Sequence, residues 1–180
     1  DGKPVLTSEY SRYLGNTNAK FNFGWNNTFS YKDFSLYVLI DGKVGGKVIS
    51  LTQAEMDFYG LSERSAEARL ANDGMVNLPD GQQITARNYY ETIGGAHLDC
   101  IYKGTNVRLR EISLGYTFYD WLGPSKHLVL SLIARNLGFL YKDSPVDPDI
   151  SATAANAFGG VDSFTLLITR SFGFNIKLTY

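Results

Sequence analysis

Six residues in the middle of the sequence have side chains that could bind a ligand. Three are tyrosines, whose ring faces can stack on sugar rings or peptides while their hydroxyls stay in water. Three are charged and stand close together, so they could contact a substrate or form ion pairs that hold loops in place. For the tyrosines, the alternative role is packing within a loop. The candidate substrate contacts are Tyr89, Tyr90, Tyr102, Arg108, Arg110 and Glu111.

The sequence shows no arrangement expected of an enzyme. His97 and His127 have no candidate partners near them in sequence, and neither a nucleophile elbow nor metal-ligand spacing occurs. Cys100 is the only cysteine, which excludes an internal disulfide and a zinc site built from several thiolates. We therefore expect no catalytic residue and no cofactor.

One acidic stretch resembles a metal-binding loop. Asp143, Asp147 and Asp149 could supply the oxygen ligands that calcium prefers. Pro148 interrupts this stretch and the spacing of an EF-hand is missing. The sequence therefore favours a plain turn without a metal.

The elements that must position these residues are strands with two different faces. In the closing segment, large apolar residues alternate with small or polar ones, and successive strand residues point to opposite faces. One face suits lipid and the other a water-filled lumen, as in an outer-membrane barrel. A half-buried strand of a soluble sandwich alternates in the same way. The large residues are Phe172, Phe174, Ile176, Leu178 and Tyr180.

Four earlier segments alternate similarly, and one long stretch does not. We expect a bulge near Arg110 and Glu111, where the alternation changes parity. Within residues 50–105, Thr52 and Glu55 have the spacing of a capping box and residues 63–70 are rich in helix formers, which predicts one or two short helices. The expected strands are residues 20–31, 34–48, 106–119, 126–137 and 164–180.

The connections alternate short and long, which is typical of a barrel with tight periplasmic turns and extended outer loops. The fold class we expect is all-β, an antiparallel transmembrane β-barrel segment of about five strands. Five strands cannot close a barrel, because open edges in lipid leave backbone groups unsatisfied. The expected parts are an outer-loop remnant at 1–19 and the carboxy-terminal part of a barrel at 20–180, with outer loops at about 50–105 and 138–162.

Composition agrees with this class. Aromatic residues make up 14% of the chain and there are 18 glycines, which favours β structure rich in turns. A net charge of −1 gives no reason to expect nucleic acid as a partner. The first residues, Asp1 to Val5, lack a basic segment followed by an apolar one, so we expect no export signal within this chain.

An ordered set of short motifs resembles the carboxy-terminal end of SusC/RagA-like TonB-dependent outer-membrane transporters of Bacteroidota. The motifs follow one another along nearly the whole chain, and a terminal aromatic residue completes them. They are Asp41-Gly42 with Gly45-Gly46-Lys47, Tyr89-Tyr90 before Gly94-Gly95, the segment from Val107 to Phe118, Ala134-Arg135-Asn136-Leu137, Asp147-Pro148, and Arg170-Ser171-Phe172-Gly173-Phe174.

This resemblance implies a barrel of about 22 strands in the bacterial outer membrane, in contact with its lipid. The family has an amino-terminal plug, is energised by TonB, and imports oligosaccharide or oligopeptide nutrients with a SusD-like surface lipoprotein. The plug, the TonB-contacting region and most of the barrel are absent from this chain. The resemblance also gives Tyr180 a role in barrel assembly, with Phe172 and Phe174 as membrane-facing residues.

A different class of protein would also fit the alternating strands. A soluble, secreted, all-β carbohydrate-binding module would carry recognition on its long loops, and its aromatic faces would form a core. This alternative predicts solubility in water without detergent.

Overall fold

The computed structural model describes residues 13–97, 99–121, 123–149 and 159–180. The chain divides into two compact units, each built from three separate stretches of sequence. We call the first the loop unit; it comprises Asp1–Asn18, Gly46–Lys103 and Pro148–Thr165. We call the second the sheet unit; it comprises Ala19–Gly45, Gly104–Asp147 and Leu166–Tyr180.

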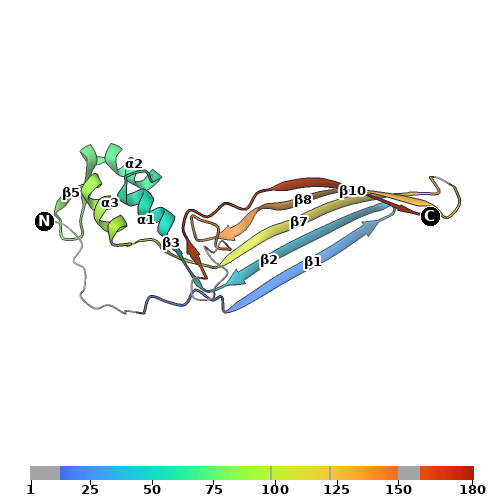
Figure 1. The fold of residues 1–180 in the computed structure, drawn as a ribbon, viewed down its shortest axis with the longest axis horizontal. Helices are drawn as coiled ribbons and strands as arrows, with labels where there is room; N and C mark the ends of the chain where they lie inside the picture. The colour runs from blue at the N-terminus through green and yellow to red at the C-terminus, as the bar shows by residue number, and fades with distance from the viewer. Residues whose placement is uncertain (1–12, 98, 122, 150–158) are drawn as a thin grey trace. The chain divides into compact units, whose positions relative to one another are not determined.

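The sheet unit contains a five-stranded sheet in which every neighbouring pair is antiparallel. The strands lie side by side in the order β1-β2-β7-β8-β10 (Figure 1). This confirms the antiparallel arrangement and the five main strands expected from the alternating sequence. The strands are β1 (Phe21–Tyr31), β2 (Phe34–Val44), β7 (Asn106–Tyr119), β8 (His127–Lys142) and β10 (Ser171–Thr179).

Strand register gathers the large apolar residues on one face of the sheet. Two rows are apolar across all five strands, and the row between them is polar or small; the next row on the opposite face also contains Tyr37 and Ile133. Two successive apolar rows are Tyr31-Phe34-Tyr116-Leu130-Ile176 and Phe29-Leu36-Leu114-Leu132-Phe174. The row between them is Ser30-Ser35-Gly115-Ser131-Asn175.

We call the side that carries the two apolar rows the apolar face, and the opposite side the polar face. Large side chains of the apolar face remain accessible: Leu132 is 67% exposed and Phe174 is 76% exposed. On the polar face, a Cβ added at Gly115 would lie 2.6 Å from Ser35 Oγ, so a larger residue there would require the serine side chain to move. The row of small residues on the polar face is therefore closely packed, whereas the two apolar rows on the opposite face remain uncovered.

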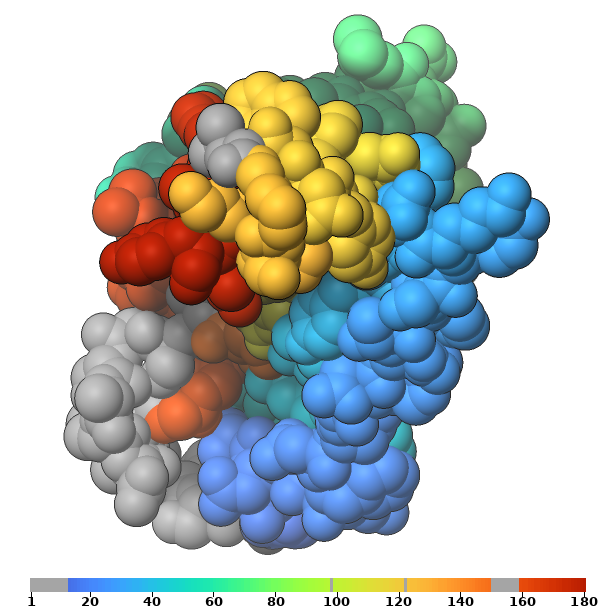
Figure 2. Space-filling view, turned by 90° about the vertical axis from the view of Figure 1, so that its right-hand side faces the viewer, coloured from blue at the N-terminus to red at the C-terminus, as the bar shows by residue number. Residues whose placement is uncertain are grey.

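The sheet bends across its strands, and its register shifts once between β2 and β7 and twice between β7 and β8. Seen from the end of the unit that carries the short turns, the strands follow an arc from β1 in blue to β10 in red (Figure 2). Against β2, Leu39 pairs with Glu111 and Ile40 pairs with Leu109, so Arg110 is the extra residue. This confirms the bulge predicted from the change in parity.

The loop unit consists of short helices and short strands. Strand β3 pairs antiparallel with β6 and parallel with β9, and β4 pairs with β5. Its elements are β3 (Lys47–Ser50), α1 (Leu51–Phe58), α2 (Glu63–Leu70), the 3-10 helix η1 (Asn72–Gly74), β4 (Met75–Asn77), β5 (Gln83–Thr85), α3 (Ala86–Gly95), β6 (Ile101–Lys103) and β9 (Val161–Asp162).

Helices α1 and α3 approach each other closely at one glycine. A Cβ added at Gly94 would lie 2.5 Å from Phe58 N and 2.6 Å from Ala54 O, so any larger residue would push the helices apart. Around this contact lies a small apolar core. Its buried members are Val48, Ala54, Ile84, Ala86, Ile93 and Cys100.

Several predicted boundaries were wrong. The second strand ends at Val44, and Lys47–Ser50 forms the separate strand β3, because Gly45 and Gly46 both adopt positive φ and turn the chain. The fourth strand continues to Lys142, because β7 offers partners as far as Asn106. The fifth strand begins at Ser171 rather than near Phe164, because Ser171 is the first residue that has a partner on β8, Arg135.

The helices also differ from the expectation. Three form instead of one or two, and the extra one, α3, carries Tyr89 and Tyr90. The residue that caps α1 is Ser50, whose Oγ accepts a hydrogen bond from Gln53 N at 3.1 Å, so the proposed capping box at Thr52 is not used. Helix α2 occupies Glu63–Leu70 as predicted.

None of the helices in the described part of the chain has the length and hydropathy needed to cross a membrane. Of the expected outer-loop remnant at 1–19, residues 1–12 lie outside the described residues, as do residues 150–158 of the expected loop at 138–162.

Candidate functional site

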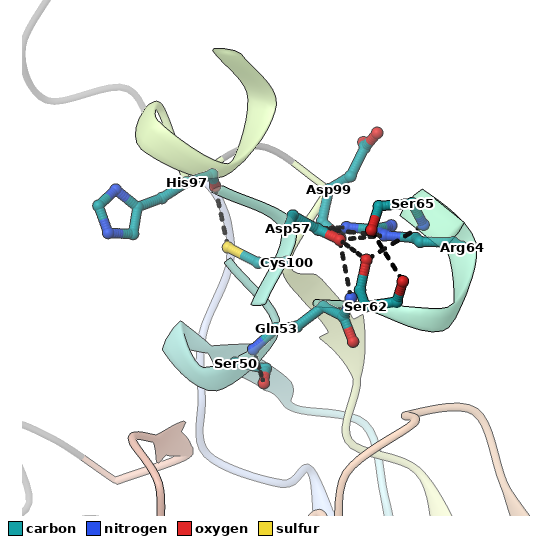
Figure 3. Close-up of polar contacts among 9 residues, drawn as sticks. All are labelled: Ser50, Gln53, Asp57, Ser62, Arg64, Ser65, His97, Asp99 and Cys100. Carbon is teal, nitrogen blue, oxygen red and sulfur yellow. Dashed lines mark hydrogen bonds and ion pairs between the residues drawn. The ribbon is translucent and has the colours of Figure 1, made fainter. Parts of the chain in front are cut away.

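A buried carboxylate organises the polar interior of the loop unit. Asp57, at the end of α1, is fully buried. Gln53 Nε2 donates to Asp57 Oδ1 at 3.0 Å and Ser62 Oγ donates to the same oxygen at 2.6 Å. Arg64 Nε donates to Oδ1 at 3.0 Å and Arg64 Nη2 pairs with Oδ2, as Figure 3 shows. A buried charge needs such partners, because it has lost its contact with water.

This network ties α1 to α2 through local helix chemistry. Ser62 is the N-cap of α2, and its Oγ accepts a hydrogen bond from Ser65 N at 3.2 Å. The same hydroxyl donates to Asp57, so one serine both begins α2 and anchors it to the end of α1.

Arg64 extends the network toward the tyrosines. Its guanidinium lies 5.9 Å from the centre of the Tyr90 ring on α3, and Nη2 lies 3.4 Å from the Asp99 carbonyl oxygen. The hydrogen bonds to Asp57 raise the pKa of Arg64, so the guanidinium is charged at every accessible pH. Its side chain is 33% exposed, which leaves part of the group facing solvent.

Two of the candidate tyrosines lie within the electrostatic influence of Arg64. Burial raises the pKa of the Tyr90 and Tyr102 phenols, and the positive charge of Arg64 opposes this rise. Both phenols are therefore neutral hydrogen-bonding groups at neutral pH. Tyr89 packs edge-on against Tyr90, with ring centres 5.3 Å apart. The three tyrosines and Arg64 form what we call the tyrosine cluster.

Cys100, a buried member of the apolar core, is the one cysteine of the chain. Its thiol donates to the His97 carbonyl oxygen at 2.9 Å, and burial raises its pKa. A neutral, buried thiol is a poor nucleophile. The His97 side chain points away from Cys100 in Figure 3, so the two do not form a nucleophile and base.

The charged candidates lie on the sheet unit and pair with other charged residues. Arg110 Nε donates to Asp41 Oδ2 at 2.8 Å across the bulge, and Arg135 Nε donates to Glu111 Oε2 at 2.7 Å. Arg108 is buried, its Nη2 donates to Asp147 Oδ1 at 2.7 Å, and its guanidinium lies 4.4 Å from the Phe139 ring centre. These pairs join β2, β7, β8 and the segment that follows β8.

The acidic stretch after β8 contributes to this network. Asp147 is the partner of Arg108, which explains why a carboxylate is buried there. Among the described residues, no group of three or more His, Cys, Asp or Glu side chains is arranged to hold a metal ion.

The closing residues Phe172 and Phe174 lie in β10, where both are exposed, and Tyr180 follows the strand. Phe174 belongs to the second of the apolar rows, opposite Leu132. Phe172 pairs with Ala134 one row further along the same face.

Sequence reasoning missed the residues that hold the tyrosine cluster together. Asp57 and Arg64 lie seven positions apart on different helices, and only the turn between α1 and α2 brings them into contact. One signal was available: Asp57 is an acidic residue on the side of α1 that also carries the buried Ala54. Such a charge implies a buried partner.

Comparison with known proteins finds a similar receptor but assigns no family. No model of a protein family matches the chain. The chain is 24% identical over 196 residues to TonB-dependent receptor P3 of Formosa agariphila. The match covers 98% of this chain and 18% of that receptor, so the chain spans less than a fifth of its relative's length.

Proposed function

We propose that this chain is the carboxy-terminal barrel segment of a TonB-dependent outer-membrane transporter of the SusC/RagA type. The sheet unit would supply about five strands of a larger barrel, and the loop unit would form part of its outer surface. The role is transport rather than catalysis.

The observation that carries this proposal is the two-faced sheet. Two apolar rows run across all five strands and most of their side chains stay exposed, while the row between them, on the other face, holds only small and polar residues. In a soluble sandwich, a second sheet would cover such a face. In a barrel, lipid covers it and the polar face lines the lumen. The similarity to a TonB-dependent receptor along nearly the whole chain supports the second reading.

The tyrosine cluster is the part of the loop unit best suited to touch a substrate. Tyr89, Tyr90 and Tyr102 offer ring faces and neutral hydroxyls, which suit the sugar rings or peptide groups of an imported oligosaccharide or oligopeptide. Arg108, Arg110 and Glu111 already hold ion pairs, so we assign them first to bracing the sheet and second to contact with a substrate. The plug, TonB and a SusD-like lipoprotein would act through other parts of the transporter.

The test uses the native protein. We expect the full-length protein, purified from bacterial outer membranes in detergent, to migrate as a compact particle before boiling and as an unfolded chain after it. Mass spectrometry should find peptides of this chain in that particle. A protein that stays soluble without detergent and does not change its migration on boiling would instead be the soluble binding module.

A further inference from the structure

The segment that leads into β10 carries exposed apolar side chains. Residues 166–170 belong to no helix or strand, and all of them are exposed. Leu166 is 94% exposed and Leu167 is 72% exposed. Leu166 and Ile168 occupy even-numbered positions, as do the apolar residues of β10 that begin at Phe172. The stretch therefore continues the alternation of β10, and its isoleucine and threonine favour a strand.

Strand β8 stops pairing with this part of the chain at Arg135, the partner of Ser171. Beyond it, β8 continues to Lys142 along β7, and its register against β7 shifts at Asn136, which has a φ of 53°. The Asn136 side chain supplies the next contact, because its Nδ2 donates to the Thr169 carbonyl oxygen at 3.4 Å. A side chain thus replaces the strand ladder on this side of residues 166–170.

This hydrogen bond also shows which way the backbone of the segment faces. None of residues 166–170 has a positive φ, which is compatible with an extended path. In an extended chain, the N–H and C=O of one residue point to the same side, and the side alternates along the chain. Since the Thr169 carbonyl faces β8, Leu167 faces β8 as well, whereas Leu166, Ile168 and Arg170 face away from it. Strand β10 lies at the edge of the sheet (Figure 1), so these three residues direct their backbone groups beyond that edge.

Strand β1, at the other edge of the sheet, cannot be the antiparallel partner of β10. Each of the four steps from β1 to β10 is antiparallel, so the two edge strands run in the same direction. Under the proposed function, further strands come from other parts of the transporter. The similar receptor, of which this chain covers 18%, is long enough to supply them.

We propose that a strand from outside this chain pairs antiparallel with β10 and continues beyond Ser171 along residues 166–170. Its backbone forms hydrogen bonds with Leu166, Ile168 and Arg170, and its side chains beside Leu166 and Ile168 are apolar. The stretch then has a strand neighbour on one side and the Asn136 side chain on the other. This inference rests on the proposed function and goes beyond it by stating how far the missing strand reaches.

The first test measures amide exchange in the full-length protein in detergent, resolved to single residues by electron-transfer fragmentation in the mass spectrometer. After correction for intrinsic rates, we expect the amides of Ile168 and Arg170 to exchange at least about tenfold more slowly than the amide of Leu167. The reason is that the first two face the proposed strand, whereas the Leu167 amide faces the side that β8 has left.

The second test uses two neighbouring proline substitutions, since proline lacks the backbone N–H. Ile168→Pro removes an N–H that faces the proposed strand, and Leu167→Pro is the matched control that removes one facing β8. Both restrict the preceding residue to extended conformations, which the proposed strand already requires. We expect Ile168→Pro to speed exchange at Arg170 at least about threefold and Leu167→Pro to leave it as in the parent protein.

The outcomes separate this inference from the proposed function. Fast exchange throughout residues 166–170 beside a protected β10 would overturn the longer strand and leave the barrel intact. Fast exchange in β10 as well would overturn the proposed function. Equal protection of Leu167 and Ile168 would mean that both sides are paired and would overturn the one-sided arrangement. Protection that disappears when the protein is diluted to single copies would make a second copy the partner, which also overturns the proposal.

Discussion

At the scale of single residues, Asp57 joins the first two helices of the loop unit. It accepts hydrogen bonds from one residue of its own helix and from two residues at the start of the next. Because it is fully buried, its partners would be left without an acceptor if it were removed. The tyrosine cluster depends on it indirectly, since Asp57 holds Arg64 and Arg64 lies over Tyr90.

Asp57→Ala should destabilise the helical part of the loop unit by about 1–3 kcal/mol, the usual cost of leaving buried hydrogen-bonding groups without a partner. Hydrogen exchange of the full-length protein, followed by mass spectrometry, should show faster exchange in α1 and α2. Glu67→Ala is the matched control, since Glu67 is an exposed carboxylate on α2. Equal exchange in the two variants would mean that Asp57 does not hold the helices together.

At the scale of elements, a second buried carboxylate joins three segments of the loop unit. Asp162 on β9 accepts hydrogen bonds from Ser50 Oγ at 2.7 Å and Thr165 Oγ1 at 2.7 Å. Ser50 is the last residue of β3 and the N-cap of α1. Its hydroxyl therefore links the end of β3 and the start of α1 to β9, with which β3 pairs in parallel. Burial alone would raise the pKa of Asp162, but the hydrogen bonds outweigh it and lower the pKa.

A lowered carboxylate pKa gives the β3–β9 pairing a defined pH dependence. The ionised Asp162 carboxylate stabilises this pairing fully above the ordinary aspartate pKa of about 3.9. The stabilisation is lost as the pH falls through the lower pKa that Asp162 has in the folded protein. We expect the exchange protection of β3 and β9, corrected for intrinsic rates, to be constant from neutral pH down to about pH 5 and to fall in more acidic solution.

Asp162→Asn provides the comparison, because an amide does not titrate in this range. Its β3 and β9 segments should show lower protection at neutral pH and no further loss on acidification. Asp99→Asn, at an exposed position, should behave as the parent protein. If Asp162→Asn kept the acid-induced loss, another group would have to be its cause.

At the scale of the whole molecule, the sheet unit ends in two strands that each have one neighbour. Strand β1 pairs only with β2 in the described sheet, and β10 pairs only with β8. Unpaired edges are costly wherever water is excluded, because their backbone groups lack partners. Under the proposed function, strands elsewhere in the transporter complete both edges.

In the full-length protein, peptides from β1 and β10 should therefore exchange as slowly as peptides from β7, which has neighbours on both sides. Residues 79–82, in the turn between β4 and β5, provide a fast-exchanging reference. Rapid exchange of β10 next to a protected β7 would show that this edge stays open, and would contradict a closed barrel.

The sequence by itself determined the parts of the fold that depend on nearest neighbours along the chain. Alternation of large and small residues identified the five main strands, and a change of parity located the bulge at Arg110. Strand geometry imposes a period of two, so these features are visible in any window of the sequence. The helix at Glu63–Leu70 followed from local composition in the same way.

Only the tertiary structure decided which distant residues meet. Strand register set the ends of β8 and β10, because a strand extends only as far as its partner does. The pairing of Asp57 with Arg64, of Arg108 with Asp147 and of Asp162 with Ser50 joins residues whose separations follow no repeat. Such contacts depend on the path of the whole backbone, which no local pattern encodes.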